Sequence, residues 1–285
     1  MKKARERRSL DQHPCFHKTA SAHWGRIHLP VAPNCNIQCN FCNRRYDCVN
    51  ESRPGVTSRV LTPAQALTAL SRCLEWRADI AVIGIAGPGD PLCDVARTLE
   101  TLRAVHAAYP EHLLCLSTNG LNLSGHIDEL ADAGVTHVTV TINAVDPQIG
   151  QQIYASVTLN HRTYQGIEAA KILLERQEEA VIGLKQRGLT VKINTVVLPG
   201  INTDHIHAIA HEAAGWGADT MNCIPLIPVR DTPFMELAAP TEGEMTVIRK
   251  SIGGQITQIH HCRRCRSDAV GLLGAAEPVG AVAAL

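Results

Sequence analysis

Short apolar runs alternate with amphipathic stretches along most of the chain. The run Ile80–Ala86 is apolar or glycine throughout, which is typical of a strand buried on both faces. Thr62–Arg77 instead repeats apolar residues three and four positions apart, after a threonine suited to an N-cap and a proline suited to the first turn. The pattern predicts strands at Ile27–Ala32, Ile80–Ala86, Leu113–Ser117, Thr136–Ile142, Leu189–Val197 and Thr220–Ile224, and helices at Thr62–Arg77, Val95–Tyr109, Ile127–Ala133, Tyr164–Arg187, Asp204–Trp216 and Glu242–Ser251.

This alternation of strands and helices predicts an α/β fold with a parallel sheet and right-handed crossovers. Six such units favour a partial (β/α)6 TIM-like barrel, with functional side chains at the C-terminal ends of the strands. After residue 225, prolines punctuate an irregular segment. We therefore expect an N-terminal arm and flap at 1–24, the partial barrel at 25–240, a C-terminal extension at 241–270 and a loosely held tail at 271–285.

Composition narrows the function classes. Hydrophobic residues at 45% and charged residues at 19% describe a globular chain able to bury a large core. Lys+Arg and Asp+Glu both number 27, which argues against a nucleic-acid partner, as does an aromatic content of 4%. No apolar run is long enough to span a bilayer, and no signal-peptide core follows Met1–Arg8. The odd number of cysteines, 11, favours metal-bound thiolates in a reducing cytoplasm over disulfides.

Three cysteines lie close together after the first expected strand, on the loop that should leave it: Cys35, Cys39 and Cys42. Thiolates are natural ligands of a [4Fe–4S] cluster, and three of them leave one iron open to a substrate. Chance would give this spacing about 0.02 times in a chain of this composition, so the signal is specific. The alternative is a zinc knuckle, with Cys48 as a fourth ligand.

The spacing of the triplet resembles that of the radical S-adenosylmethionine (SAM) superfamily. The resemblance implies that the open iron chelates SAM and that one electron releases a 5′-deoxyadenosyl radical. Phe41 matches the aromatic position whose neighbourhood touches adenine in that superfamily. The segment Gly87-Pro88-Gly89-Asp90-Pro91 resembles its glycine-rich amino-group motif, because glycines permit a close approach of backbone to cofactor. A plain turn between strand and helix would look the same.

Later strand ends supply further candidates for SAM binding. Small polar side chains at the ends of the third and fourth strands suit ribose hydroxyls or the carboxylate, and residues after the fifth and sixth strands would edge the adenine. Taken singly, such residues are more often caps or turn residues. The candidates for SAM binding are Phe41, Gly87, Gly89, Asp90, Thr118, Asn119, Asn143, Val145, Asn202 and Ile224.

Five other cysteines lie in contexts that suit metal ligands. Cys262 and Cys265 form a Cys-x-x-Cys after the barrel, beside histidines and arginines, although chance alone gives such a pair about 0.4 times. Cys15 stands between histidines near the N-terminus, Cys48 follows the triplet and Cys115 lies on the third strand. Five are too many for one zinc site. The remaining cysteines, which we expect to be buried small hydrophobes, are Cys73, Cys93 and Cys223.

From about His13 to Cys265 the chain is similar to the NifB family of nitrogenase cofactor assembly proteins. The segment Asn50–Val56 is unusual among radical SAM enzymes, so the likeness is to this family and not only to the superfamily. The residues that carry the likeness are His13-Pro14-Cys15, Val31–Arg44, Tyr46-Asp47-Cys48, Asn50–Val56, Gly87–Leu92, Asn143–Pro147 and Cys262-x-x-Cys265. The chain resembles the compact form without a further carrier domain.

The resemblance implies a substrate as well as a cofactor. Two [4Fe–4S] clusters, K1 and K2, would be fused with a SAM-derived carbide and an added sulfur into an [8Fe-9S-C] precursor of the nitrogenase cofactor. A reductant protein, a cluster donor and cofactor-scaffold or carrier proteins would be the partners. Carried over by position, Cys35, Cys39 and Cys42 would hold the SAM-cleaving cluster, His28, Cys262 and Cys265 would hold K1, and Cys15, Cys48 and Cys115 would hold K2.

Some assignments remain open at the level of the sequence. His28 on a strand also fits the role of a hydrogen-bonded core histidine. Glu51 and Arg53 are candidates for positioning or proton transfer near the clusters, or else a solvated loop pair. The alternative functions are a different radical SAM enzyme with auxiliary clusters, such as a molybdopterin-type cyclase or a peptide maturase, and a non-catalytic metal carrier.

Overall fold

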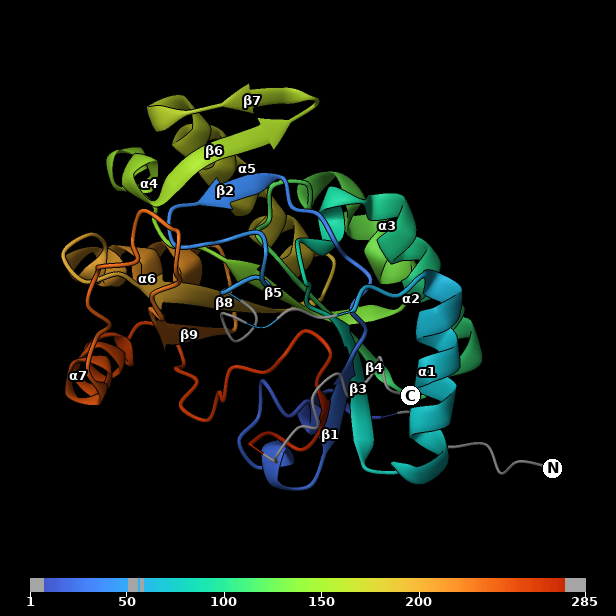
Figure 1. Cartoon of the computed structure of the whole chain (residues 1–285). Helices are drawn as coiled ribbons and strands as arrows, with labels where there is room; N and C mark the ends of the chain where they lie inside the picture. The colour runs from blue at the N-terminus through green and yellow to red at the C-terminus, as the bar shows by residue number, and fades with distance from the viewer. Residues whose placement is uncertain (1–7, 51–55, 57–58, 275–285) are drawn as a thin grey trace.

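The computed structural model describes residues 8–50, 56 and 59–274 (Figure 1). Its core is a seven-stranded sheet with the strand order β10-β1-β3-β4-β5-β8-β9. Six strands run parallel, and only β10 runs antiparallel to its neighbour among the strands of this sheet that the structure describes. The strands are β1 (Gly25–His28), β3 (Ile80–Ile85), β4 (Leu113–Thr118), β5 (Val135–Thr141), β8 (Thr190–Val197), β9 (Thr220–Pro225) and β10 (Val270–Gly271).

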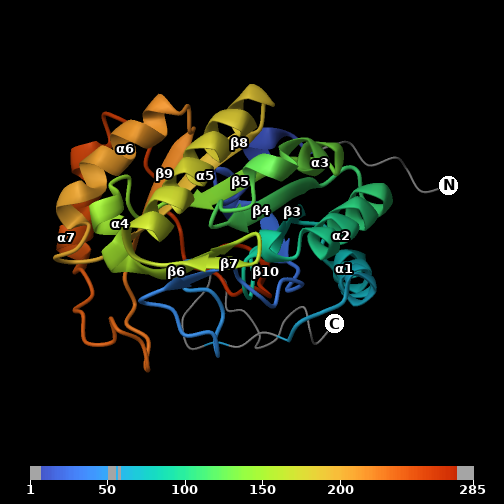
Figure 2. The same ribbon diagram turned by 90° about the horizontal axis from the view of Figure 1, so that it is seen from above.

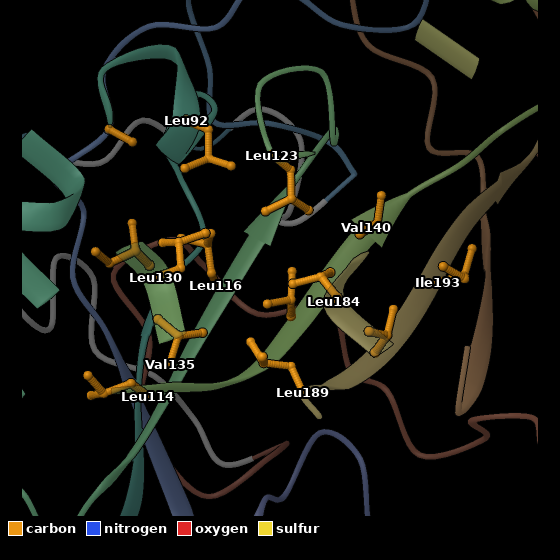
Figure 3. Packing of buried hydrophobic residues seen from close by; sticks show 14 of the residues in the cluster. Leu92, Leu114, Leu116, Leu123, Leu130, Val135, Val140, Leu184, Leu189 and Ile193 are labelled. Atoms are coloured by element: carbon orange, nitrogen blue, oxygen red, sulfur yellow. The ribbon is translucent and has the colours of Figure 1, made fainter. Parts of the chain in front are cut away.

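Helices cover the outer face of this curved sheet (Figure 2). They are α1 (Pro63–Trp76), α2 (Val95–Ala108), α3 (Ile127–Asp132), α5 (Gly166–Gln186), α6 (Ile206–Gly215) and α7 (Glu242–Ile252). Leu130 of α3 and Leu184 of α5 pack against Leu114, Leu116 and Val140 of the strands in one continuous apolar cluster (Figure 3). The predicted α/β partial barrel is confirmed. Within the described residues, no helix combines the length and the apolar character that crossing a membrane would need.

A second, three-stranded sheet was not expected from the sequence. It pairs β2 (Ile37–Cys39) with β6 (Tyr154–Leu159), and β6 with β7 (Arg162–Tyr164), all antiparallel. The helix α4 (Pro147–Ile153) leads directly into β6. Strands of three residues are too short to show a period, so the sequence pattern could not reveal them. The expectation that all three cysteines lie on a loop after the first strand was therefore wrong for Cys39, which ends β2.

The first strand is shorter than predicted because the backbone turns away from the sheet after His28. The Leu29 N–H still donates to the Gly84 carbonyl, but Pro30 has no N–H to continue the ladder, and the Val31 N–H donates back to Leu29. The other predicted strands and helices lie within a residue or two of the observed bounds. At the far end, Gly271 pairs with Arg26 in β10, so the range expected to be a loose tail begins inside the sheet.

Candidate active site and cluster cavities

The cysteine triplet surrounds a small cavity at the C-terminal ends of the strands. Cys35, Cys39 and Cys42 line it together with Cys48 and residues from the ends of β3, β4 and β5. The Gln38 amide shapes the loop, since its Nε2 donates to the carbonyl of Cys39 at 3.0 Å and to that of Cys42 at 2.8 Å. The sequence therefore brings the three predicted cluster ligands to one place, on a loop fixed by its own side chains.

Arg44 places a cation against this loop. Its Nη2 donates to the carbonyls of Cys35 at 3.1 Å and Ile37 at 2.5 Å. Burial raises the pKa of the Cys35 thiol to about 11, and it also raises the pKa values of Cys39 and Cys42, while Arg44 acts in the opposite direction on all three. The thiols are thus neutral in the metal-free chain, and binding iron must release their protons next to a fixed positive charge.

Asp90 is an internal anchor between strands. Its carboxylate accepts hydrogen bonds from the Leu92 N–H at 2.8 Å, the Thr118 hydroxyl at 2.9 Å and the Asn119 N–H at 2.6 Å. The Asn119 amide in turn donates to the Asn36 side chain at 2.7 Å and lies 3.6 Å from the Cys35 sulfur. Three of the predicted SAM-binding residues therefore form one network that ties the end of β4 to the cysteine loop.

The loop after β3 requires glycine at two positions. Gly87 has φ near 131°, in the region that side chains avoid, and its backbone faces Ser267. At Gly89 a Cβ atom would collide with the backbone of Asn34, while the Gly89 N–H donates to the Ala32 carbonyl at 2.5 Å. Gly89 also lines the triplet cavity. The predicted close approach at this loop is therefore an approach of backbone to the cysteine loop itself.

The remaining predicted SAM contacts are spread more widely. The Asn202 amide donates at 2.9 Å to the carbonyls of Asn143 and Val196, and its oxygen accepts from the Leu198 N–H at 2.7 Å. The Val145 N–H donates to His205. Phe41 is buried in the apolar cluster beneath the small sheet, and Ile224 lines the second cavity described below. Asn143 and Asn202 thus bond to each other and to backbone at the strand ends.

The second cavity lies inside the barrel and collects most of the other predicted ligands. Cys115 comes from β4 and His28 from β1, Cys15 comes from the N-terminal segment, and Cys262 and Cys265 come from the C-terminal segment. The two chain ends meet there, since the His261 ring donates to the Pro14 carbonyl at 3.0 Å. Asn50 and Ser117 line both cavities, so the two spaces adjoin. Cys48, by contrast, lines the triplet cavity.

Hydrogen bonding fixes the tautomer of His28. Its Nδ1 lies 3.1 Å from the Arg266 carbonyl, which can only accept, so Nδ1 carries the proton and Nε2 keeps its lone pair. Burial lowers the pKa of His28 to about 4, so the ring is neutral near pH 7. A carbonyl behind one ring nitrogen is the usual partner of a histidine that binds metal through the other. A Cβ atom at Gly84 would lie 3.2 Å from this ring, so glycine leaves it room.

A buried polar contact joins the segments that carry Cys48 and Cys265. The Ser267 hydroxyl donates to the Asp47 carboxylate, and both residues are fully buried. Beside them, Arg266 and Asp268 form a buried ion pair with contacts of 2.6 and 3.0 Å. The hydrogen bond between Ser267 and Asp47 therefore fixes the C-terminal segment to the barrel. Glu51 and Arg53 lie outside the described residues, so their predicted roles stay predictions.

The thiols of the triplet line one shared cavity. Within residues 8–50, 56 and 59–274, no three His, Cys, Asp or Glu side chains converge as the ligands of one metal ion would. The thiols of the triplet instead share the wall of one cavity, and a four-iron cluster takes each thiolate on a different iron. The donor set of three thiols and a nearby guanidinium suits such a cluster. Cys73 and Cys223 are buried as expected, and Cys93 is half-buried.

Three cations near the cavities were not identified from the sequence; Arg26 and Lys192 are buried, and Arg44 is exposed. Arg26 on β1, Arg44 behind the triplet and Lys192 on β8 all lie close to predicted ligand cysteines. Lys192 is the one charged residue of the almost entirely buried strand Thr190–Val197, and it lines the second cavity. A charged residue in a strand buried on both faces was the available signal, since such a residue needs a specific partner.

Two solved structures share this fold at low sequence identity. Methylornithine synthase (PylB) matches with a TM-score of 0.56 and 12% identity, covering 87% of this chain and 67% of that one. The FeFe-hydrogenase maturase HydG from Carboxydothermus hydrogenoformans also matches with a TM-score of 0.56 and 12% identity, covering 82% of this chain and 52% of that one. At this identity the likeness concerns the fold alone.

Sequence relatives are much more similar. The chain is 48% identical over 93% of its length to the FeMo cofactor biosynthesis protein NifB of Chlorobaculum tepidum, of which it spans 63%. It is 47% identical over 93% of its length to NifB of Bradyrhizobium diazoefficiens, spanning 54%, and 46% identical over 92% to that of Klebsiella pneumoniae, spanning 57%. The resemblance to NifB stated from the sequence is confirmed, and the chain spans just over half the length of these relatives.

A family model, described as the Radical SAM superfamily, matches residues 29–213. Members of this superfamily use a [4Fe–4S] cluster and SAM. The match covers well over half of the chain and includes the triplet, so the chain belongs to the Radical SAM superfamily of enzymes.

Proposed function

We propose that this chain is a NifB-type enzyme that uses radical SAM chemistry to fuse two [4Fe–4S] clusters, with a SAM-derived carbide and an added sulfur, into the [8Fe-9S-C] precursor of the nitrogenase cofactor. The observation that carries the proposal is the second cavity. It gathers His28, Cys15, Cys115, Cys262 and Cys265 next to the cavity of the triplet. An enzyme that merges two clusters needs ligands for both within reach of its SAM site.

In this proposal the two cavities have separate tasks. Cys35, Cys39 and Cys42 would hold a [4Fe–4S] cluster, which would offer an open iron to SAM and pass on one electron from the reductant. Arg44 would offset part of the negative charge of the thiolates, and solvent screening reduces this effect because the Arg44 side chain is exposed. The Asp90 network holds the end of β4 and the cysteine loop at a fixed distance.

The second cavity would hold the substrate clusters. His28 would offer Nε2 while Arg266 orients the ring, and Cys262 and Cys265 would complete the K1 site. Cys15 and Cys115 would hold K2 with Cys48, which lies at the junction with the SAM site. Ligands from both chain ends suit clusters that must later leave. A reductant protein, a cluster donor and a scaffold or carrier protein would be the partners, and the reducing cytoplasm their compartment.

Iron counting tests the proposal. Anaerobic reconstitution should load about twelve irons per chain if three four-iron clusters bind. Replacing Cys35, Cys39 and Cys42 together by alanine should remove about four, and so should replacing Cys262 and Cys265. The buried Cys73→Ala variant is the matched control and should keep the full count. A saturated wild-type protein with only four irons would exclude the fusion of two bound clusters.

Product analysis separates the alternatives. Under the proposal, Cys15→Ala should still cleave SAM to 5′-deoxyadenosine under reducing conditions but should no longer accumulate the large iron–sulfur product. A cyclase or peptide maturase with auxiliary clusters would make no such product in the wild type. A metal carrier would not cleave SAM, whereas under both enzyme hypotheses cleavage is present and is lost in Cys39→Ala.

A further inference from the structure

Arg26 is a cation buried in the wall of the half-barrel. It lies on β1 two residues before His28, and only 1% of its surface is exposed. Residues two apart in a strand face the same side of the sheet, so Arg26 and His28 share a face. A guanidinium removed from water requires compensating partners, because its desolvation is costly. The partners of the guanidinium therefore indicate the role of Arg26.

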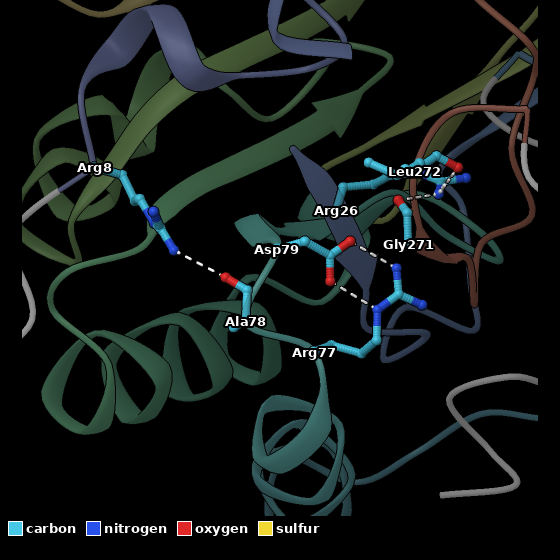
Figure 4. Close-up of polar contacts among 7 residues, drawn as sticks. All are labelled: Arg8, Arg26, Arg77, Ala78, Asp79, Gly271 and Leu272. Atoms are coloured by element: carbon cyan, nitrogen blue, oxygen red, sulfur yellow. Dashed lines mark hydrogen bonds and ion pairs between the residues drawn. The ribbon is translucent and has the colours of Figure 1, made fainter. Parts of the chain in front are cut away.

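Among the described residues, the C-terminal segment supplies a sulfur and two carbonyls to Arg26. Its Nη2 donates to the sulfur of Cys265 at 2.9 Å. Its Nη1 donates to the carbonyls of Gly271 at 2.5 Å and Leu272 at 3.1 Å (Figure 4). The carboxylate drawn beside it, Asp79, takes both guanidinium hydrogen bonds of Arg77 at 2.8 and 2.7 Å. One terminal nitrogen of the Arg26 guanidinium thus bonds to a sulfur, and the other bonds to backbone carbonyls in β10 and just after it.

The contact sets a positively charged donor against a sulfur, so the hydrogen bond is charge-assisted when that sulfur is a thiolate. Such bonds are short, and their direction is set by the planar fork of the guanidinium. Hydrogen bonds and positive charge at a cluster sulfur stabilise the reduced, more negative cluster, and they are among the main determinants of its potential. Residues that orient metal ligands in this way affect metal affinity by roughly 10- to 100-fold. Arg26 meets this description for Cys265.

We propose that Arg26 is a positioning residue for the substrate cluster held at Cys265, where its hydrogen bond to the ligand sulfur raises the cluster's reduction potential and slows its loss. The inference rests on the proposed function, since it needs a cluster at Cys265. The same guanidinium also holds β10 against β1 and so helps to position Cys265, which lies in the segment just before β10. The arginines beside the Cys-x-x-Cys differ from Arg26, since Arg263 is exposed and Arg266 forms its ion pair with Asp268.

The experiment measures the cluster and not turnover. In a background with Cys35, Cys39 and Cys42 changed to alanine, the reconstituted protein is titrated with reductant while its spin-resonance signal is followed, and iron loss to a chelator is timed. Arg26→Gln should lower the midpoint potential and speed iron loss by roughly 10-fold or more. Arg26→Lys keeps the charge but not the fork, so its potential should lie closer to the wild type while iron loss is still faster.

Arg77→Gln is the matched control. Arg77 is another arginine next to β10, with its guanidinium against Gly271, but within the described part of the chain its guanidinium donates to Asp79 and not to a sulfur. If Arg26 acts on the cluster, Arg77→Gln should leave the potential unchanged. Equal shifts in Arg26→Gln and Arg77→Gln would reduce Arg26 to a support for β10 and overturn the inference. If Arg26→Gln does not fold, the Arg26→Lys variant is compared with Arg77→Gln instead. Iron loss from Arg26→Lys that is no faster than from Arg77→Gln would overturn the inference.

A further variant separates the two proposals. Cys265→Ala in the same background should lose iron if a cluster binds there. An unchanged iron count in Cys265→Ala would overturn the proposed K1 site and the role of Arg26 together. Loss of iron in Cys265→Ala, combined with wild-type potential and retention in Arg26→Gln, would overturn the role of Arg26 and leave the proposed function standing.

Discussion

The N-terminal segment that carries Cys15 is held in place by a buried aromatic cluster, and its stability should depend on pH. His13 and Phe16 pack against His137 of β5 with ring centroids 4.4 and 4.7 Å from the His137 ring. Lys192 lies 4.9 Å from the Phe16 ring. Burial, followed by the charges of His17 and Lys192, lowers the pKa of His137 to about 3. His137→Phe should therefore remove a titrating group while keeping the ring contacts.

The sign follows from proton binding. An unfolded histidine titrates near pH 6.5, so between pH 6.5 and 3 the unfolded chain binds a proton that folded His137 does not. Stability contributed by a neutral His137 is therefore complete above the unfolded pKa and falls as the pH drops through this window. At pH 5 the difference is about 1.5 pH units at about 1.36 kcal/mol each, or about 2 kcal/mol. The pKa of His13 is lowered as well, so its contribution has the same sign.

Urea unfolding under anaerobic conditions, followed by circular dichroism at pH 8 and pH 5, measures this effect. The wild type should lose stability on acidification, and His137→Phe should lose about 2 kcal/mol less between the same two pH values. His137→Phe also loses the hydrogen bond between Thr136 and the His137 ring, which lowers its stability at both pH values. Comparing the loss of stability between pH 8 and pH 5 in the two proteins cancels this effect. His211→Gln, on the exposed face of α6, should behave as the wild type does. Equal losses in the wild type and His137→Phe would refute the reasoning.

Three other changes test contacts around the cavities. Gly84→Ala should push the His28 ring, 3.2 Å away, and remove about four irons from the reconstituted protein with its circular dichroism unchanged; a full iron count would contradict this. Asn202→Ala leaves three buried backbone groups without partners and should lower the free energy of unfolding by about 3 kcal/mol in urea, and a change below about 1 kcal/mol would count against it. Ser267→Ala removes one hydrogen bond of the buried Asp47 carboxylate and should speed amide exchange at 265–272 in mass spectrometry; unchanged exchange there would argue that the contact does not hold the segment.

The parallel half-barrel was predictable because its strands are buried on both faces. Ile80–Ile85 is apolar at nearly every position, and a short run of that kind is typical of a strand covered on both sides by other elements. The antiparallel sheet of β2, β6 and β7 was not predictable, since its pairings join Ile37 to Val157 across more than a hundred residues. Local periodicity carries no information about such partners.

For the site, spacing within one loop was informative and long-range contacts were not. The triplet could be predicted because its ligands are neighbours in sequence. Asp90, Asn143 and Asn202 have the composition of ligand-binding residues, yet their side chains are engaged in fixing the strand ends. Arg26 was missed because its partner Cys265 is 239 residues away. The sequence shows which polar and charged residues are present, but not which of them come into contact in the folded chain.

The meeting of the two chain ends also bears on biosynthesis. Pro14 and His261 touch although 247 residues separate them, and Cys15, Cys262 and Cys265 border the same space. A ribosome-bound chain that has emerged as far as β9 already contains the triplet. It still lacks the C-terminal segment that lines part of the second cavity. Under the proposed function, substrate clusters should therefore enter this cavity only after Cys262 and Cys265 have been synthesised.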